Sequence, residues 1–332
     1  MSNILFSIFL FLTFYTALAS AQSSSKLSFD EELSQFSYPF EVKTFELESQ
    51  NQSLSMRYMD VGDQNSEKVI VLLHGKNFSG YYWKRIAEDL VRLGYRVVVP
   101  DQIGFGKSSK PNYYQYSFSQ LASNTQLLLK SLNIPTYTVV GHSMGGMLGV
   151  NMAYLFPGSV NKLILINPIG LEPYLDYVEY KEPGFFYKKE LSKTIDKIRN
   201  YQKMNYYDGE WNEEYEKLLI PYKGWLNGPD WKKVAWNNAL TYGPIFTEDI
   251  TPKFEKITQE TYFIIGTRDT TGPGRAWKKD GVNHKLGQYH KLGRAAKSQV
   301  KNATLIELPG LGHLPQFEDY ERFSEVFLPI VK

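Results

Sequence analysis

Short, nearly continuous apolar runs recur along the chain and alternate with longer amphipathic stretches. Apolar runs rich in β-branched residues are typical of parallel strands that are covered on both faces. Amphipathic stretches between them predict helices, and strand–helix alternation implies right-handed crossovers in a doubly wound sheet. The strands are expected at 69–73, 96–99, 137–140, 162–166, 261–265 and 304–308, and the helices at 82–93, 118–132, 144–156 and 316–328.

Two earlier segments alternate between apolar and polar residues with a period of two. They cover residues 41–48 and 53–60, and polar turn residues separate them. This pattern predicts an antiparallel hairpin. The hairpin and the six later strands together predict an α/β fold with a mostly parallel, eight-stranded sheet flanked by helices.

The alternation stops after residue 170 and returns near residue 261. Residues 171–250 are rich in Tyr, Trp, Lys and Glu and contain no buried-strand pattern. We therefore expect a mostly helical cap inserted between two parts of the sheet domain. The expected organisation is 38–170 for the first part of the core, 171–250 for the cap and 251–332 for the second part.

The N-terminus has the pattern of a secretory signal. No charged side chain occurs between Met1 and Ala21, and an apolar run is followed by Ala19-Ser20-Ala21, a small-x-small cleavage pattern. The sequence predicts a signal peptide (1–21) cleaved after Ala21, a polar leader (22–37), and a secreted or periplasmic protein without stable membrane insertion after cleavage. The alternative is an uncleaved membrane anchor.

Composition and charge exclude several classes of function. Lys and Arg number 37 against 35 Asp and Glu, a net charge of +2, so the field that neutralises nucleic-acid phosphates is lacking. Cysteine is absent, which excludes disulfides, a thiol nucleophile and a thiolate metal site. Any nucleophile is therefore an oxygen or an amine. The aromatic content of 15% is typical of a chain that also lines apolar pockets.

The strongest chemical motif follows the expected strand 137–140. Gly141-His142-Ser143-Met144-Gly145-Gly146 leads directly into a helix-compatible segment. Flanking glycines permit a strained strand-to-helix turn that exposes the serine hydroxyl above the carboxyl edge of the sheet. Ser143 is therefore the predicted nucleophile.

A serine nucleophile needs a base and an acid that orients the base. His313 follows the last expected strand, and Asp269 follows the strand before it, so both belong to the same edge of the sheet. Serine, acid and histidine then occur in the chain order typical of this arrangement. The alternative acid position follows strand 162–166, where Asn167 stands and Glu172 is the nearest carboxylate.

The oxyanion of an acyl-transfer reaction needs two backbone donors. One is expected to be the amide of Met144, directly after the nucleophile. The other is expected from the loop after strand 69–73, where Gly75 allows a close approach; we favour the amide of Lys76, with Asn77 as the second choice.

These motifs together resemble the α/β-hydrolase superfamily, and the resemblance covers residues 38–332. The matching segments are His74-Gly75, Asp101 to Ser108, Gly141 to Gly145, Asp269 and Gly312-His313. The Asp101 to Ser108 loop is similar to that of epoxide hydrolases and haloalkane dehalogenases. Those enzymes use an aspartate nucleophile where this chain has Ser143, which argues against both reactions. The interval between acid and histidine is longer than usual, and we expect residues 270–293 to form a loop near the entrance.

The remaining histidines have simpler expected roles. His142 is expected to pack within the turn, and His74 is expected to orient the oxyanion loop by hydrogen bonding. His284 and His290 lie in a Lys-rich segment without a carboxylate cluster, so solvated loop residues are favoured over a metal pair. Asp101 is expected to bind the amides of its own turn.

The sequence therefore predicts a serine hydrolase that cleaves carboxylic esters through an acyl-enzyme, without a cofactor. The expected partner is an apolar or aromatic small-molecule ester, because the cap supplies aromatic surface over the nucleophile. Its tryptophans are the expected substrate contacts: Trp211, Trp225, Trp231 and Trp236. The alternatives are a C–C bond hydrolase, an amidase, or a non-catalytic binding protein that retains the pocket.

Overall fold

The computed structural model describes residues 26–332 and contains one eight-stranded sheet in the order β1-β2-β4-β3-β5-β6-β7-β8. The β1–β2 and β2–β4 pairs are antiparallel, and all other pairs are parallel. The predicted sheet is therefore confirmed. The strands are β1 Val42–Ser49, β2 Gln52–Val61, β3 Val69–Leu73, β4 Arg96–Pro100, β5 Tyr137–His142, β6 Val160–Ile166, β7 Glu260–Gly266 and β8 Ala303–Leu308.

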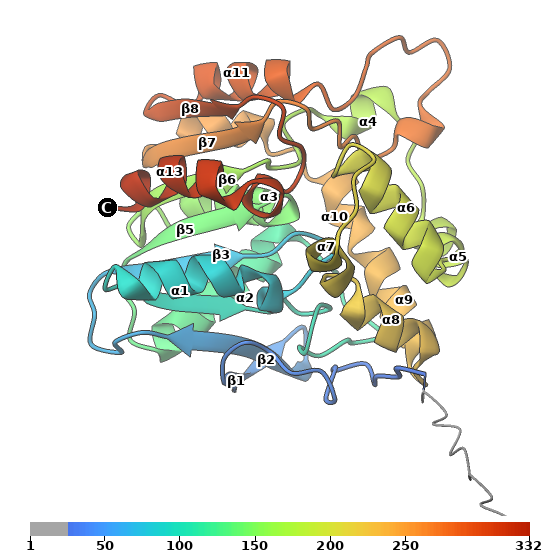
Figure 1. Ribbon diagram of the computed structural model, residues 1–332, viewed down its shortest axis with the longest axis horizontal. Helices are drawn as coiled ribbons and strands as arrows, with labels where there is room; N and C mark the ends of the chain where they lie inside the picture. Colours follow the sequence, from blue (N-terminus) through green and yellow to red (C-terminus); the bar gives the residue numbers. More distant parts are fainter. Residues whose placement is uncertain (1–25) are drawn as a thin grey trace, which may run out of the picture.

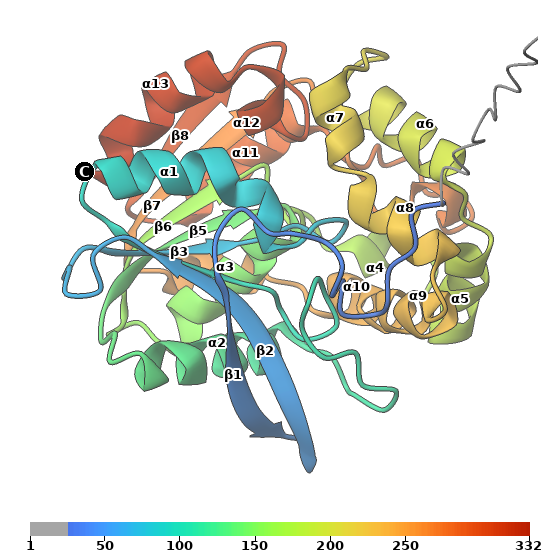
Figure 2. The same cartoon turned by 60° about the horizontal axis from the view of Figure 1, so that its bottom comes forward.

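Helices cover both faces of the sheet (Figures 1 and 2). α1 (Lys84–Arg92) and α13 (Tyr320–Val331) contribute to one hydrophobic cluster, together with one set of strand side chains. α2 (Phe118–Ser131), α3 (Met144–Leu155) and α11 (Tyr289–Gln299) contribute to the cluster on the opposite face. The strands are buried on both faces because each face has its own helical layer, which explains their continuous apolar runs.

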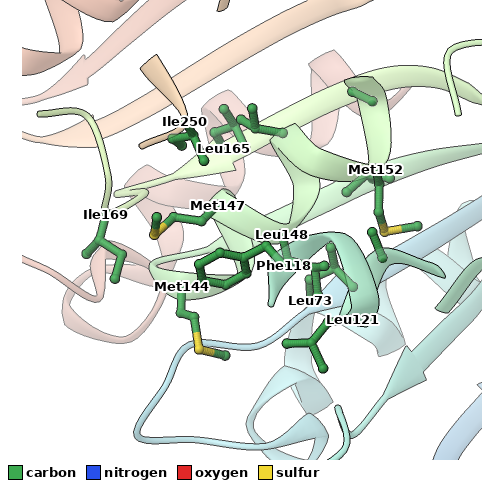
Figure 3. Close-up of a cluster of buried hydrophobic side chains, with 14 of the residues drawn as sticks. Leu73, Phe118, Leu121, Met144, Met147, Leu148, Met152, Leu165, Ile169 and Ile250 are labelled. Carbon is green, nitrogen blue, oxygen red and sulfur yellow. The ribbon is translucent and has the colours of Figure 1, made fainter. Parts of the chain in front are cut away.

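The helix that follows the predicted nucleophile is buried almost all round. Ten residues of α3 are buried, from Met144 to Ala153. Its methionines pack among residues of β3, α2 and β6, including Leu73, Phe118 and Leu165 (Figure 3). A helix that is apolar on every side belongs in the core, so the residue at its N-terminus is held by rigid surroundings.

Seven helices lie between β6 and β7 and gather beyond the carboxyl ends of the parallel strands (Figure 1). This is the helical cap that the sequence predicts. The helices are α4 Tyr174–Tyr177, α5 Pro183–Leu191, α6 Ile195–Asn205, α7 Glu213–Lys217, α8 Ile220–Asn227, α9 Trp231–Leu240 and α10 Tyr242–Thr247.

Several elements differ from the prediction at their ends. The single C-terminal helix is two helices, α12 (Pro315–Glu318) and α13, because the side chain of Asp319 accepts a hydrogen bond from the amide of Arg322 and begins a new helix. The expected loop 270–293 ends earlier, since α11 starts at Tyr289. The short 3₁₀ helices are η1 Gly80–Trp83, η2 Thr251–Lys256 and η3 Arg275–Trp277.

The described part of the expected leader packs against the cap. Phe29 and Leu33 are buried in a cluster with residues of α6, α8 and α9. A Cβ on Gly224 would lie 1.9 Å from the Phe29 ring, so the close contact requires glycine there. The predicted signal peptide and its cleavage site lie outside the described residues. Within residues 26–332, no helix combines the length and apolar character needed to cross a bilayer.

Candidate active site

Ser143 occupies a strained turn between β5 and α3. Its φ of 57° and ψ of −119° are unfavourable for a residue with a side chain. The turn is tight because a Cβ on Gly141 would lie 2.3 Å from the Gly145 carbonyl oxygen, and a Cβ on Gly145 would lie 2.2 Å from that of Leu73. Both glycines are therefore required sterically, as the motif predicts.

The structure brings Ser143, His313 and Asp269 into one hydrogen-bonded chain. The His313 Nε2 atom lies 3.0 Å from the Ser143 Oγ, and the His313 Nδ1 atom lies 2.7 Å from an Asp269 carboxylate oxygen. A carboxylate only accepts, so the imidazole proton is on Nδ1 and the lone pair of Nε2 faces the serine hydroxyl. The loops after β5, β7 and β8 supply the three side chains, each from the carboxyl end of its strand.

Two further groups hold the Asp269 carboxylate. The Asn167 side-chain amide donates to its Oδ2 at 2.9 Å, and the Thr271 backbone amide donates to its Oδ1 at 2.7 Å. Burial raises the pKa of Asp269, but the charge of His313 and the hydrogen bonds from His313 and Thr271 outweigh burial and lower the pKa below its ordinary value. The carboxylate is therefore ionised at neutral pH and accepts from every neighbour.

The sequence marks Asn167 only as the residue at an alternative position for the acid. Its side-chain oxygen accepts from the Gly266 amide at 2.9 Å, so it also links the ends of β6 and β7. Its position directly after a strand, at the edge that carries the serine and the acid, is the signal that could have identified it.

Glu172, the alternative acid, lies in a different cluster. Its carboxylate contacts the His284 Nε2 at 2.7 Å and accepts from the Gly287 amide at 2.8 Å. His284 also stacks on Tyr177 with the ring centroids 3.8 Å apart. His284 is therefore not the solvated loop residue that the sequence predicts, because it anchors the long loop after β7 to the start of the cap. His290 is exposed.

The predicted oxyanion donors lie close to Ser143. Met144 is the first residue of α3, so its amide has no acceptor within the helix. The Lys76 amide has no hydrogen-bond acceptor among residues 26–332. Gly75 brings this loop against the nucleophile, since a Cβ on Gly75 would lie 3.2 Å from the Ser143 Cβ.

His142 does more than pack within the turn. Its Nε2 lies 2.8 Å from the carbonyl oxygen of His313 and must donate to it, so its Nδ1 accepts from the Tyr82 hydroxyl at 3.0 Å. The Tyr82 oxygen in turn accepts from the Gly75 amide at 3.1 Å. Burial and the proximity of His313 lower the pKa of His142 to about 3, so it stays neutral and links the loops of the base and of the expected oxyanion site.

His74 and Asp101 bind backbone groups around the same site. The His74 Nδ1 donates to the Gly75 carbonyl at 3.0 Å, while its Nε2 accepts from the Gln102 amide at 3.1 Å. Asp101 is buried and accepts from the Gly80 amide at 2.6 Å and from the Lys107 amide at 2.7 Å. Asp101 thus binds its own turn, as the sequence predicts, and also the loop that follows β3.

Ser143 and His313 open onto a cavity of about 610 Å³ between the sheet and the cap. The volume is in the range of small-molecule sites. Aromatic and aliphatic side chains line much of it: Ile169, Phe186, Tyr201, Tyr206, Tyr222, Tyr242, Ile245, Phe246 and Trp277. Across residues 26–332, no group of three or more His, Cys, Asp or Glu side chains is arranged to hold a metal ion.

The prediction for the cap tryptophans needs correction, because none of the four lines this cavity. Trp225 and Trp236 donate their indole N–H groups to backbone carbonyls of the leader and of the loop before α2. Trp211 donates to a carboxylate of α7, and Trp231 packs in the cluster that holds the leader. The four tryptophans pack within the cap or against the leader and the loop before α2, whereas tyrosines, phenylalanines and Trp277 line the cavity.

Comparisons with known proteins agree with this architecture. The family model described as alpha/beta hydrolase fold matches residues 68–320. The structure of a probable hydrolytic enzyme from Pseudomonas aeruginosa PAO1 is 40% identical, has a TM-score of 0.89, and covers 92% of this chain and 99% of its own. An esterase from Exiguobacterium antarcticum shares the fold at 17% identity and a TM-score of 0.67, with coverage of 86% and 98%.

Curated relatives match over shorter segments. A cis-3-alkyl-4-alkyloxetan-2-one decarboxylase from Xanthomonas campestris is 34% identical over 34% of this chain and 40% of its own length. A putative carbamate hydrolase from Pantoea ananatis is 29% identical over 49% of this chain and 58% of its own. The matches thus span less than two thirds of these relatives. The family model covers most of the chain, and together with the sheet topology it shows that this protein belongs to the α/β-hydrolase family.

Proposed function

We propose that this α/β hydrolase cleaves carboxylic esters of small molecules through an acyl-enzyme intermediate. The observation that carries the proposal is the hydrogen-bonded chain of Ser143, His313 and Asp269 at the floor of a largely aromatic cavity. Such a chain activates an otherwise weakly nucleophilic hydroxyl, and the cavity volume of about 610 Å³ is in the range of small-molecule sites.

In the first half of the reaction, Ser143 Oγ attacks the ester carbonyl while its proton passes to His313 Nε2. Ionised Asp269 stabilises the imidazolium and keeps the remaining proton on Nδ1. The amides of Lys76 and Met144 donate to the oxyanion. The bond to the alkoxy oxygen then breaks, and the alcohol leaves with the proton from His313.

In the second half, water attacks the acyl-enzyme while His313 removes its proton. The tetrahedral intermediate collapses, the carboxylic acid leaves, and Ser143 regains its proton from His313. The proton transfers use Ser143, His313 and Asp269, which are already hydrogen-bonded to one another. No cofactor takes part in this scheme.

The proposal is tested by measuring hydrolysis of p-nitrophenyl esters of increasing acyl length, with Ser143→Ala as the variant. We expect turnover by the wild type and a loss of roughly 10⁴ to 10⁶-fold in kcat for the variant, because the covalent route is removed. A fluorophosphonate should label the wild type at Ser143 and leave the variant unlabelled. A folded Ser143→Ala protein with a tenth of the wild-type rate would exclude this mechanism.

The same constellation also serves the hydrolysis of amides, carbamates and certain C–C bonds, since the triad does not define the acyl donor. The partial similarity to a putative carbamate hydrolase is the reason to include carbamates in the assay. Ester kcat/KM well above that of matched amides and carbamates supports the proposal. Binding of esters without turnover would instead indicate the non-catalytic alternative.

We further propose that the protein is exported and acts outside the cytoplasm, in the periplasm or the extracellular medium. The apolar, uncharged run before Ala21 and the small-x-small pattern support this proposal.

A further inference from the structure

The cavity above Ser143 has a mixed lining. Its aromatic side chains include Phe186, Tyr242, Phe246 and Trp277. It is also lined by five basic residues: Lys76, Lys189, Lys193, Lys197 and Arg275. Among residues 26–332, the one acidic residue that lines the cavity is Glu190. The chain as a whole is nearly neutral at +2, so this concentration of positive charge is local.

Glu190 neutralises only one of these cations. Its carboxylate is buried and lies 2.8 Å from the Lys193 Nζ. Burial raises the pKa of Glu190, but Lys193 and Lys76 outweigh burial and lower it. The carboxylate is therefore ionised and forms a buried ion pair with Lys193, and its one negative charge also acts on Lys76.

The other four basic side chains form no ion pair with a carboxylate among residues 26–332. The Lys76 Nζ donates to the Asn238 carbonyl at 2.9 Å and to the Thr241 hydroxyl at 3.0 Å. The Lys197 Nζ donates to a backbone carbonyl at 2.8 Å, and the Arg275 guanidinium likewise donates to backbone carbonyls. The Lys189 Nζ lies 4.6 Å from the centroid of the Trp277 ring.

These cations occupy two depths. Lys189, Lys197 and Arg275 are exposed, whereas Lys76 and Lys193 are partly buried. Burial lowers the pKa of Lys76 to about 7; the charge of Glu190 opposes this lowering, and the nearby Lys193 adds to it. A cavity lined mainly by positively charged side chains raises the local concentration of anions and lowers their free energy. A bound anion would also relieve the repulsion between Lys76 and Lys193.

We propose that the cavity selects amphipathic anionic esters, in which a carboxylate remote from the scissile bond contacts the basic side chains and an apolar portion contacts the aromatic rings. This inference rests on the proposed ester hydrolysis and adds the substrate class. It differs from the sequence-based expectation of a purely apolar or aromatic ester. The basic residues bind and orient the substrate, and the triad performs the chemistry.

The test compares matched esters that differ only in charge. The acyl series consists of the p-nitrophenyl hydrogen esters of adipate, suberate and sebacate, each against its methyl ester. The alcohol series consists of 4-acetoxyphenylacetate against its methyl ester. Each kcat/KM is divided by the spontaneous rate. We expect the anionic member of at least one pair to exceed the neutral member by roughly tenfold at low salt, equivalent to about 1.4 kcal/mol. Added salt should reduce this preference because exposed charges are screened.

Variants that remove positive charge test whether the preference for anionic esters depends on the basic side chains of the cavity. Lys189→Gln combined with Lys197→Gln should lower the anionic-to-neutral ratio by roughly threefold or more, since each exposed contact is worth up to about 1 kcal/mol. The matched control is Lys188→Gln combined with Lys203→Gln, which removes the same charge from the same helices, α5 and α6, at residues that do not line the cavity. The control should keep the wild-type ratio.

Failure of this inference is distinguishable from failure of the proposed function. Equal kcat/KM for charged and neutral members in every pair, or an equal effect of the control variant, overturns the substrate class and leaves ester hydrolysis intact. If no ester is hydrolysed, the proposed function fails, and calorimetry with Ser143→Ala decides the charge preference separately. Monomethyl suberate should then bind roughly tenfold more tightly than dimethyl suberate, and equal affinities would overturn the inference.

Discussion

Replacing Asp269 with asparagine changes hydrogen-bonding chemistry at a buried position with almost no change in shape. The carboxylate accepts from His313 and Asn167 on one oxygen and from the Thr271 amide on the other. An asparagine amide must place its NH₂ group toward one of these sides, and either choice sets a donor against a donor.

The rotamer that satisfies Thr271 points the NH₂ group at the His313 Nδ1. The imidazole then moves its proton to Nε2, where it faces the Ser143 hydroxyl and can no longer accept the serine proton. The opposite rotamer keeps the tautomer but leaves the buried Thr271 amide unpaired, which costs about 1–3 kcal/mol. Neither rotamer supplies a negative charge to stabilise the imidazolium.

We therefore expect Asp269→Asn to lower kcat/KM for ester hydrolysis by roughly 10³ to 10⁴-fold, or about 4–5.5 kcal/mol of barrier. Steady-state kinetics on p-nitrophenyl esters measures the loss, and circular dichroism and thermal melting verify the fold. Glu172→Gln is the matched control, because Glu172 is another largely buried carboxylate that pairs with a histidine. It should stay within about tenfold of the wild type. A folded Asp269→Asn enzyme with a tenth of wild-type activity, or greater damage from Glu172→Gln, would refute this assignment of the acid.

Three further predictions concern stability, selectivity and processing. The pKa of buried His142 is lowered from 6.5 to about 3, so between these pH values the folded protein keeps it neutral while the unfolded chain binds a proton. Up to about 1.4 kcal/mol of the free energy of unfolding should therefore be lost per pH unit as the pH falls below 6.5. Urea unfolding should show a flatter pH dependence for His142→Gln, and parallel losses in both proteins would contradict this linkage. Trp277→Ala should change the ester-length preference because Trp277 lines the cavity, whereas Trp236→Ala should leave it unaltered. Equal shifts of the ester-length preference in assays of both variants would argue against the observed cavity lining. The exported protein should begin at Gln22, as N-terminal sequencing can establish, and a mature chain that starts at Met1 would favour the anchor.

The local sequence pattern was sufficient to predict the sheet and the candidate triad of Ser143, Asp269 and His313. Parallel strands buried on both faces must be continuously apolar, so their positions are visible in the hydropathy of the chain. The turn around Ser143 tolerates no Cβ at Gly141 or Gly145, and this steric demand leaves a readable motif. Because parallel strands end at one edge, the placement of Asp269 and His313 after later strands was enough to predict that they meet the serine.

The lining of the cavity was decided only by tertiary structure. Tryptophan, tyrosine and phenylalanine contribute similar apolar surface, so the pattern of the cap does not distinguish a ring that packs against the leader from one that faces the substrate. Trp225 is tied to the leader by contacts between residues almost 200 positions apart, whereas Trp277, outside the expected cap, lines the cavity. The sequence did not predict the basic side chains of the cavity either, because a net charge of +2 says nothing about where cations gather. Lys76, Lys197 and Arg275 come from three distant segments, and only the packing of the cap on the sheet brings them to one cavity.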